Sequence, residues 1–592
     1  MLLATYQPDI ESINGSLTAS ALVAALPLAT LFVLLGVLRI TAWISGLAAL
    51  LVSILVATIG FDMPVDQALV VSSWGAAFGF FPIMWIVINA IWIYNMTVET
   101  GHFDVLRRSF AAVSDDMRIQ AIIIAFCFGA LMEALAGFGT PVAISSFMLM
   151  GLGFRPLKAA ALSLVANTAP VAFGALATPI VTLSTVTTAA VDPSQAGDFT
   201  TDRLGALVGH QTPVLALFVP LALVFIVDGK RAIRQTWPAA VVCGVAFAIA
   251  QWLTSTYFSV QLTDIIASLV SALAVVALLR FWQPAEPYVE HADTVAEQDA
   301  GAGPAGGVSS GRRPVPTGVR TSTGGNAPGG TGTPATEAGI STEPVQDTPA
   351  DVARAYAPYL VIIAIFSIVQ IPAVKDELAK EPWTYLFQWP GLDLVTAGGA
   401  PPADFTFNWL AAAGTLTIVA GLITIPIIGI SAAGALKAYG ATYRQLAPAI
   451  VTVMAVLALA YVMNNSGQTG ALGNWLATAG SAFALLSPVL GWLGVAVTGS
   501  DTSSNSLFGA LQVTAANQAG LDPALMAAAN SSGGVLGKMI SPQNLAIAAA
   551  AVGMTGREGD IFRRVVGWSV LFLAVMCVLV YLQTTVLEWM LP

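Results

Sequence analysis

Three charged side chains in this sequence lie inside otherwise apolar stretches. Glu133, Asp501 and Lys538 have only apolar, small or hydroxyl residues as immediate neighbours. A carboxylate in the centre of a membrane segment costs at least about 2.5 kcal/mol on insertion scales, so it usually faces a partner or a water-filled path. Because loss of solvation favours the neutral form of a carboxyl group, Glu133 is predicted to bind and release a proton. The alternative is a structural carboxylate whose protonation never changes.

The other two charges each suit two roles. Asp501 is followed by Thr502 and Ser503, and there it either stabilises a turn or contributes to an ion site. Lys538 follows a glycine inside an apolar run. It either pairs with a buried carboxylate or meets an anionic substrate. A lysine that extends to the membrane surface is the simpler alternative.

The stretches around these charges repeat one pattern in the two halves of the chain. In each stretch an Asn is followed by a hydroxyl residue, then by Gly seven positions and Pro twelve positions after the Asn. The matching residues are Asn167, Thr168, Gly174 and Pro179 in the first stretch and Asn530, Ser531, Gly537 and Pro542 in the second. Two Gly- and Pro-interrupted apolar segments in corresponding halves are the best sequence indication of a transporter's binding site.

Helix breaks at these positions favour an anionic ligand. A half-helix that starts after a break at 167–170 or 530–534 presents N–H groups and the positive end of its dipole, and small side chains let a ligand approach the backbone. A carboxylate therefore fits better than a sugar or a cation, although the same oxygens suit sodium. The predicted substrate-binding residues are Gly139, Thr140, Asn167, Thr168, Thr502, Asn530, Ser531 and Lys538, with Asp501 and Ser503 supporting them or holding an ion.

Composition identifies an integral membrane protein. Of 592 residues, 56% are hydrophobic and 9% are charged, against about 25% charged in soluble proteins. The formal charge is −10 and basic patches are lacking, so membrane lipid rather than nucleic acid is the expected surrounding. The three cysteines lie singly in apolar runs, which suits neither disulfides nor a metal site. Without a phosphate-binding loop, a serine-nucleophile motif or a zinc motif, we predict neither an enzyme nor an ATP-driven pump, and no cofactor.

Long apolar helices must position these residues. We predict an all-α polytopic fold of about twelve membrane spans, at 20–38, 40–59, 68–99, 159–189, 206–227, 237–256, 261–280, 356–373, 406–429, 446–464, 524–552 and 565–587. The long run 68–99 has two shorter helices as its alternative. Two further stretches, 121–152 and 484–517, have short apolar arms around a tip rich in Gly, Ser and Thr. We interpret both as re-entrant hairpins, with a pair of ordinary spans as the alternative in each case.

The distribution of positive charge orients these helices. With both hairpins in place, nearly every Lys and Arg falls on one side, including the loops around Arg118 and Arg564. The opposite side receives acidic loops, with Arg203, Lys375 and Lys380 as its basic residues. This orientation places both termini outside the cytoplasm. It also makes the two hairpins open to opposite sides, as expected of inverted repeats.

A compositionally distinct segment, 284–355, separates the first membrane half (1–283) from the second (356–592). The segment is rich in Gly, Pro, Ala, Thr and Ser and has almost no large apolar residues, so it buries too little surface to fold. We predict a disordered cytoplasmic linker. Its expected role is to space the two halves, with regulation as the alternative.

Four stretches in the two membrane halves resemble signature sequences of the bacterial L-lactate permease family. They read ALAGFGTPVAI, LSLVANTAPVAFGALATPI, TGSDTSSNSLFGALQ and NSSGGVLGKMISPQNLAIA. The resemblance implies a plasma-membrane symporter that imports lactate, and often glycolate or related 2-hydroxy monocarboxylates such as D-lactate, with a proton. It also implies similarity to the wider group of ion transporters with inverted repeats and paired hairpins. The long linker departs from the expected family pattern, and the resemblance itself assigns no substrate residue.

Lactate is an anion at neutral pH, and an inside-negative potential opposes its entry by about 2.3 kcal/mol per 100 mV. Entry with one proton is electrically neutral, and we place lactate between the hairpin tips and the broken helices. The alternatives are a sodium-coupled carboxylate symporter, a passive anion channel, and a sensor that keeps the transporter fold and uses the linker as its output. The sequence leaves open the preferred hydroxy acid, the stoichiometry and whether the chain forms oligomers.

Overall fold

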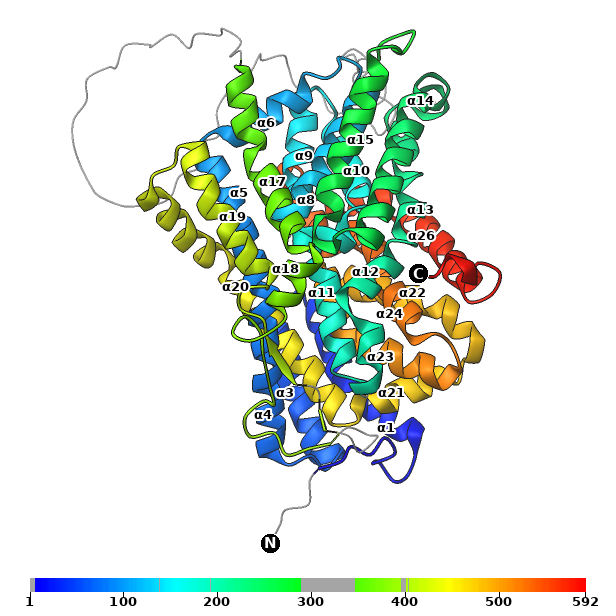
Figure 1. Ribbon diagram of the computed structural model, residues 1–592. Coiled ribbons are helices and arrows are strands. Elements are labelled where there is room, and N and C mark those ends of the chain that lie inside the picture. Colours follow the sequence, from blue (N-terminus) through cyan, green and yellow to red (C-terminus); the bar gives the residue numbers. More distant parts are fainter. Residues whose placement is uncertain (1–5, 138, 192, 289–346, 396–400, 403) are drawn as a thin grey trace, which may run out of the picture. The chain divides into compact units, whose positions relative to one another are not determined.

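Helices make up most of the described chain (Figure 1). The computed structural model describes residues 6–137, 139–191, 193–288, 347–395, 401–402 and 404–592. The described residues up to Tyr288 and from Pro349 onward cluster in one unit. The predicted linker residues 289–346 lie outside the described residues.

The described residues of the first half form fifteen α-helices, whose bounds are as follows. They are α1 (Leu17–Ala24), α2 (Leu26–Phe32), α3 (Ala42–Gly60), α4 (Val65–Phe78), α5 (Trp85–Glu99), α6 (His102–Ala111), α7 (Met117–Gln120), α8 (Gly129–Ala136), α9 (Thr140–Gly151), α10 (Pro156–Ala166), α11 (Gly174–Thr188), α12 (Thr201–Val208), α13 (Thr212–Ala216) and α14 (Val219–Tyr257), followed by α15 (Thr263–Leu279). Three π-helical segments, Val33–Val37 (η1), Gly79–Met84 (η2) and Ala121–Phe128 (η3), and three 3₁₀ turns, Val171–Phe173 (η4), Pro193–Phe199 (η5) and Val260–Leu262 (η6), connect them.

The second half has the same helical character and one small sheet. Its elements are α17 (Pro349–Val369), α18 (Pro372–Leu378), β1 (Tyr385–Phe387), β2 (Phe405–Phe407), α19 (Ala413–Ile428), α20 (Ala432–Asn465), α21 (Gln468–Ala477), α22 (Phe483–Thr498), α23 (Asp501–Ala519), α24 (Pro523–Gly537), α25 (Pro542–Ala551) and α26 (Glu558–Gln583). The 3₁₀ turns are Gly480–Ala482 (η8), Lys538–Ile540 (η9) and Glu588–Met590 (η10).

The all-α polytopic prediction is confirmed. Within the described residues, eleven helical segments are long and apolar enough to cross a membrane, judged by length and composition. The predicted spans 206–227 and 237–256 lie in one interrupted helical segment, Thr201–Tyr257. The first arms of both predicted hairpins, Met117–Ala136 and Gly480–Thr498, also reach this length. The total is close to the predicted twelve, although the set of helices differs.

The first repeat consists of a helical hairpin and an interrupted helix. One arm runs from α7 through η3 into α8, and α9 forms the return arm. At the tip, Gly137 and Gly139 have φ of 40° and 83°, values that favour glycine. α10 then ends at Ala166 with Asn167 as its C-cap, and the chain passes through η4 into α11, whose first turn contains three left-handed residues, 175–177.

The second repeat follows the same order. α22 and α23 form the hairpin, which turns at Gly499 with φ of 75°. The Ser500 hydroxyl accepts the Ser503 N–H and caps α23. α24 ends at Gly537, η9 follows, and α25 begins at Pro542, where proline is tolerated because the first helical N–H has no partner to lose.

The predicted break at 530–534 is wrong in position. Asn530 to Gly534 lie inside α24, and the helix is interrupted later, at 538–541. Although glycine disfavours helix, the glycines here let α24 pack closely on α22, and this packing stabilises the helical segment. An added Cβ at Gly533 would lie 2.1 Å from the Pro488 carbonyl oxygen, and one at Gly491 would lie 1.9 Å from the Asn530 carbonyl oxygen.

Other boundaries also differ from the predicted ones. Run 68–99 divides at Phe81, which has extended backbone (φ −123°, ψ 121°) before Pro82, as steric contact with a proline ring requires. Span 406–429 starts later, because 405–407 pairs antiparallel with β1 and α19 begins at Ala413. α17 begins at Pro349, within the segment predicted to be linker.

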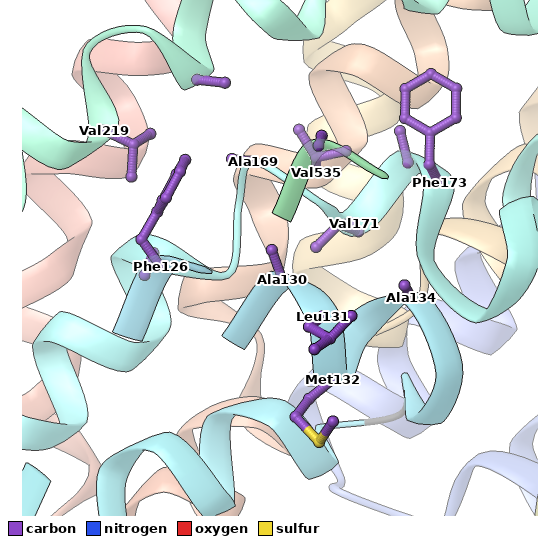
Figure 2. Packing of buried hydrophobic residues seen from close by; sticks show 14 of the residues in the cluster. Phe126, Ala130, Leu131, Met132, Ala134, Ala169, Val171, Phe173, Val219 and Val535 are labelled. Carbon is purple, nitrogen blue, oxygen red and sulfur yellow. The ribbon is translucent and has the colours of Figure 1, made fainter. Parts of the chain in front are cut away.

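Two groups of helices bury the apolar side chains. α20 packs along α3, α4 and α5, and it also contacts α23 of the second repeat. The repeat helices share a second cluster, part of which Figure 2 shows, with Ala130 and Leu131 of α8 near Val171 of η4 and Val535 of α24. Segments far apart in the sequence thus share one core around the two breaks.

Ion pairs join loops that the charge distribution assigns to the same side. Lys375 Nζ lies 2.7 Å from Asp202 Oδ2, and both residues belong to loops predicted to be outside. Arg118 lies 4.0 Å from Asp228, and both belong to loops predicted to be cytoplasmic. These contacts agree with the predicted pairing of loops.

We expect Gly533→Ala to destabilise the protein, because the added methyl group would push α24 away from α22. Overpacking of this kind costs about 1–3 kcal/mol. Thermal unfolding of the purified protein in detergent should show a lower apparent melting temperature. Gly567→Ala in α26 is the control, since an added Cβ there meets nothing within 4 Å. Equal melting temperatures for the two variants would contradict the close helix contact.

Candidate functional site

A cavity of about 110 Å³ lies where the two repeats meet. Its wall combines α8, α11, the start of α23, η9 and part of α20. The lining residues are Ala42, Glu133, Gly137, Val171, Gly174, Ala175, Thr178, Pro179, Ala449, Thr452, Val453, Thr498, Gly499, Ser500, Asp501, Thr502, Ser503, Lys538 and Gln543. A space of this size holds a few water molecules or one small organic ion.

A buried ion pair in the cavity wall joins the two repeats. Lys538 Nζ of η9 lies 2.6 Å from Glu133 Oε1 of α8, and the side chains are 8% and 3% exposed. Charges removed from water are stable only when they are paired and hydrogen-bonded. Loss of either partner would leave the other as an uncompensated buried charge.

A residue at the first helix break forms a hydrogen bond to the second carboxylate oxygen of Glu133. Asn167 Nδ2 donates a hydrogen bond to Glu133 Oε2 at 3.0 Å. Gly174 leaves room for the carboxylate, because an added Cβ there would lie 2.8 Å from Glu133 Oε1. The two carboxylate oxygens therefore bind one partner from each repeat.

Asp501 is held by the second repeat alone. Ser531 Oγ donates to Asp501 Oδ2 at 2.6 Å, and Asn505 Nδ2 donates to the same oxygen at 3.4 Å. The other oxygen, Oδ1, is buried without a hydrogen-bond partner among the described residues. It lies against α24, since an added Cβ at Gly534 would be 2.3 Å away. Asp501 thus connects α23 to α24 at the edge of the cavity.

A chain of amides continues from Asp501 into both repeats. Asn505 Nδ2 also donates to the Pro179 carbonyl oxygen at 3.1 Å. Asn530 Nδ2 donates to Asn505 Oδ1 at 2.9 Å, and Gln512 Nε2 donates to Asn530 Oδ1 at 3.1 Å. The network holds the Pro179 carbonyl, which follows the left-handed turn of α11, next to the middle of α24.

The turn before Pro179 is strained. Ala175, Leu176 and Ala177 have φ of 45°, 54° and 60°, and the left-handed conformation costs roughly 1–2 kcal/mol per non-glycine residue. All three are buried, and Ala175 lines the cavity. Such strain persists only where the surrounding structure determines it, and it is concentrated at functional sites.

The predicted site residues fall into three groups. Glu133, Asp501, Thr502, Ser503 and Lys538 line the cavity. Asn167 and Ser531 contact it through hydrogen bonds to Glu133 and Asp501, and Asn530 does so through Asn505.

The third group does not line the cavity. Gly139 faces α25, because an added Cβ would lie 2.4 Å from Ile547. Thr140 begins α9 beside it. The Thr168 hydroxyl, just after α10, donates to the Val165 carbonyl of α10 at 2.7 Å.

Asp264, a further buried carboxylate that is absent from the predicted site, lies at the start of α15. Gln251 Nε2 donates to Asp264 Oδ1 and to the Ala169 carbonyl oxygen, each at 3.2 Å. The aspartate therefore lies behind the first break. The available signal was an acidic residue inside the predicted span 261–280, but such residues are also common in the first turn of a helix.

The described part of the chain holds no group of three or more His, Cys, Asp or Glu side chains arranged to bind a metal ion. The polar groups of the cavity suit an organic anion. The ammonium group of Lys538 supplies positive charge, and the first turn of α23 presents backbone N–H groups.

Comparison with known proteins gives consistent matches over nearly the full chain. The family model described as L-lactate permease matches residues 20–313 and 327–587. An L-lactate permease of Bacillus subtilis (strain 168) is 38% identical over 98% of both chains. An L-lactate permease of Escherichia coli (strain K12) is also 38% identical over 98% of both chains. The glycolate permease GlcA of the same strain is 40% identical over 98% of both chains.

Among solved structures, the YdaH transporter of Alcanivorax borkumensis matches with a TM-score of 0.31 and 18% identity, covering 77% of this chain and 85% of that chain. This similarity is too low to support an argument. The full-length matches include both hairpins, both interrupted helices and the cavity between them. The resemblance inferred from the four sequence motifs is therefore confirmed. The chain belongs to the L-lactate permease family, and it is a multi-pass protein of the plasma membrane.

Proposed function

We propose that this protein is a secondary active transporter that imports L-lactate and related 2-hydroxy monocarboxylates, glycolate and D-lactate, by proton symport. The observation that carries the proposal is the buried Glu133–Lys538 pair in the wall of a small cavity between two repeats. Lys538 supplies a cation that can bind the carboxylate of a substrate, and Glu133 supplies a carboxylate that can bind a proton. The names of the relatives, L-lactate permeases and a glycolate permease, support the substrate class.

The repeats support a transport mechanism rather than an enzymatic one. Substrate sites of secondary transporters lie where two repeats meet, at interrupted helices, and access alternates as one part moves against the other. The cavity here lies between both hairpins and both breaks, and α20 closes one side of it. We propose that the repeat helices move against the group that contains α3, α4, α5 and α20.

Proton coupling is assigned to Glu133. A lactate anion that enters alone moves charge against the membrane potential, at about 2.3 kcal/mol per 100 mV. Entry together with one proton is electrically neutral. Glu133 lines the cavity and is nearly inaccessible to bulk water, so a proton bound there would travel with the substrate.

We expect Glu133→Gln to abolish lactate accumulation driven by a pH gradient, while exchange of lactate for lactate continues. Glutamine has the shape of protonated glutamate but cannot release a proton. Uptake of labelled L-lactate into proteoliposomes, with and without an imposed gradient, measures both activities. Glu377→Gln on the exposed helix α18 is the control and should accumulate lactate as wild type does. Persistent gradient-driven accumulation in Glu133→Gln would assign coupling to another group.

Replacement of sodium by choline at constant pH should leave wild-type accumulation unchanged, because the proposed counter-ion is the proton. A protonophore should abolish that accumulation. The same proteoliposome assay measures both effects. Uptake that requires sodium would establish the sodium-coupled alternative, and equilibration without accumulation under any gradient would indicate a channel.

A further inference from the structure

The ammonium group of Lys538 uses only part of its hydrogen-bonding capacity within the described residues. An ammonium group has three N–H donors, and among the described residues Lys538 Nζ donates to Glu133 Oε1. Both residues line the cavity. The cation nearest to any anion in this cavity is therefore already neutralised by a carboxylate of the protein.

Among the described residues, the cavity lining contains no second positively charged side chain besides Lys538. Asp501 from α23 is the remaining titratable side chain of the cavity wall, and it adds negative charge. Asp264 from α15 lies behind the first break and is hydrogen-bonded to Gln251. α3, α11 and α20 contribute no ionisable side chain to the lining. A carboxylate ligand must therefore interact with Lys538 or remain unpaired.

We propose that the substrate carboxylate and Glu133 compete for Lys538, and that protonation of Glu133 releases the ammonium group to the substrate. This inference rests on the proposed function and specifies its coupling step. A proton from water binds Glu133 Oε1, the ion pair with Lys538 separates, and the substrate carboxylate forms a new ion pair with Nζ. No covalent bond changes.

The net charge of the site links proton binding at Glu133 to carboxylate binding at Lys538. With Glu133 ionised and no substrate, the pair has no net charge. With Glu133 protonated and a carboxylate on Lys538, the net charge is again zero. Whatever the charge of Asp501, the proton and the anion bring opposite charges into one buried site, so each offsets the charge that the other adds. Each ligand therefore raises the affinity for the other, as linkage requires.

The surroundings of Glu133 permit this exchange. Gly137 and Gly174 line the cavity beside it, so no side chain from these positions blocks access to the ion pair. Asn167 remains bonded to Oε2. Its amide donates to that oxygen whether or not Oε1 carries a proton, so Glu133 keeps its place after it releases Lys538.

The test is lactate binding by purified protein from about pH 5.5 to pH 8.5, a range in which lactate stays ionised. Wild type should lose affinity about tenfold per pH unit at the alkaline end, as the linkage of one proton requires. In weakly buffered solution it should take up one proton per lactate bound. A flat pH profile for wild-type binding would overturn the proposal without any variant.

Glu133→Gln should bind lactate with little pH dependence and, at alkaline pH, more tightly than wild type, because the competing carboxylate is gone. It should take up no proton on binding. A purely structural role for Glu133 would not produce tighter binding. An unchanged pH slope in this variant would overturn the proposal, whereas absence of lactate transport by wild type would overturn the proposed function itself.

Lys538→Gln should bind lactate at least about tenfold more weakly than wild type, and it leaves Glu133 unpaired. The double variant Glu133→Gln/Lys538→Gln separates folding from binding. We expect it to recover thermal stability relative to Lys538→Gln but not to recover lactate affinity. Lys437→Gln, which removes an exposed lysine of α20, is the control. A double variant that binds lactate as tightly as Glu133→Gln would overturn the role of Lys538.

Discussion

The buried ion pair between Glu133 and Lys538 is the constraint on which the rest of the site depends. The two residues are 405 positions apart, and neither is stable in a nonpolar interior without the other. Their contact therefore holds the first hairpin against the break in the second repeat. Any movement that separates them requires a proton or another ion to take the place of the lost partner.

Close packing of helix backbones brings Glu133 and Lys538 within contact distance. Membrane helices approach one another closely where small residues face the interface, and glycines occupy such positions here. Gly174 makes room for the Glu133 carboxylate, and Gly534 makes room for Asp501. Gly533 brings α24 against α22. Close packing thus explains the glycines at 174, 533 and 534, whereas those at 137, 139 and 499 are explained by their positive φ.

The amide network gives the two breaks their fixed shape. Asn505 bonds to Asp501, to the Pro179 carbonyl and to Asn530, so it connects α11, α23 and α24. Buried polar groups that satisfy one another make a core rigid and specific. In such a frame the ion pair in the cavity is the charged contact that joins the two repeats.

The sequence by itself determined the membrane class, the two repeats, the family and the charged residues of the site, because hydropathy, spacing and isolated charges are properties of the chain itself. Tertiary structure decided which of these residues meet. It joined Glu133 to Lys538, kept Asn530 inside a helix, and left Thr140 and Thr168 outside the cavity lining. These outcomes depend on how closely helices from distant parts of the chain approach, and that depends on packing between surfaces rather than on local spacing.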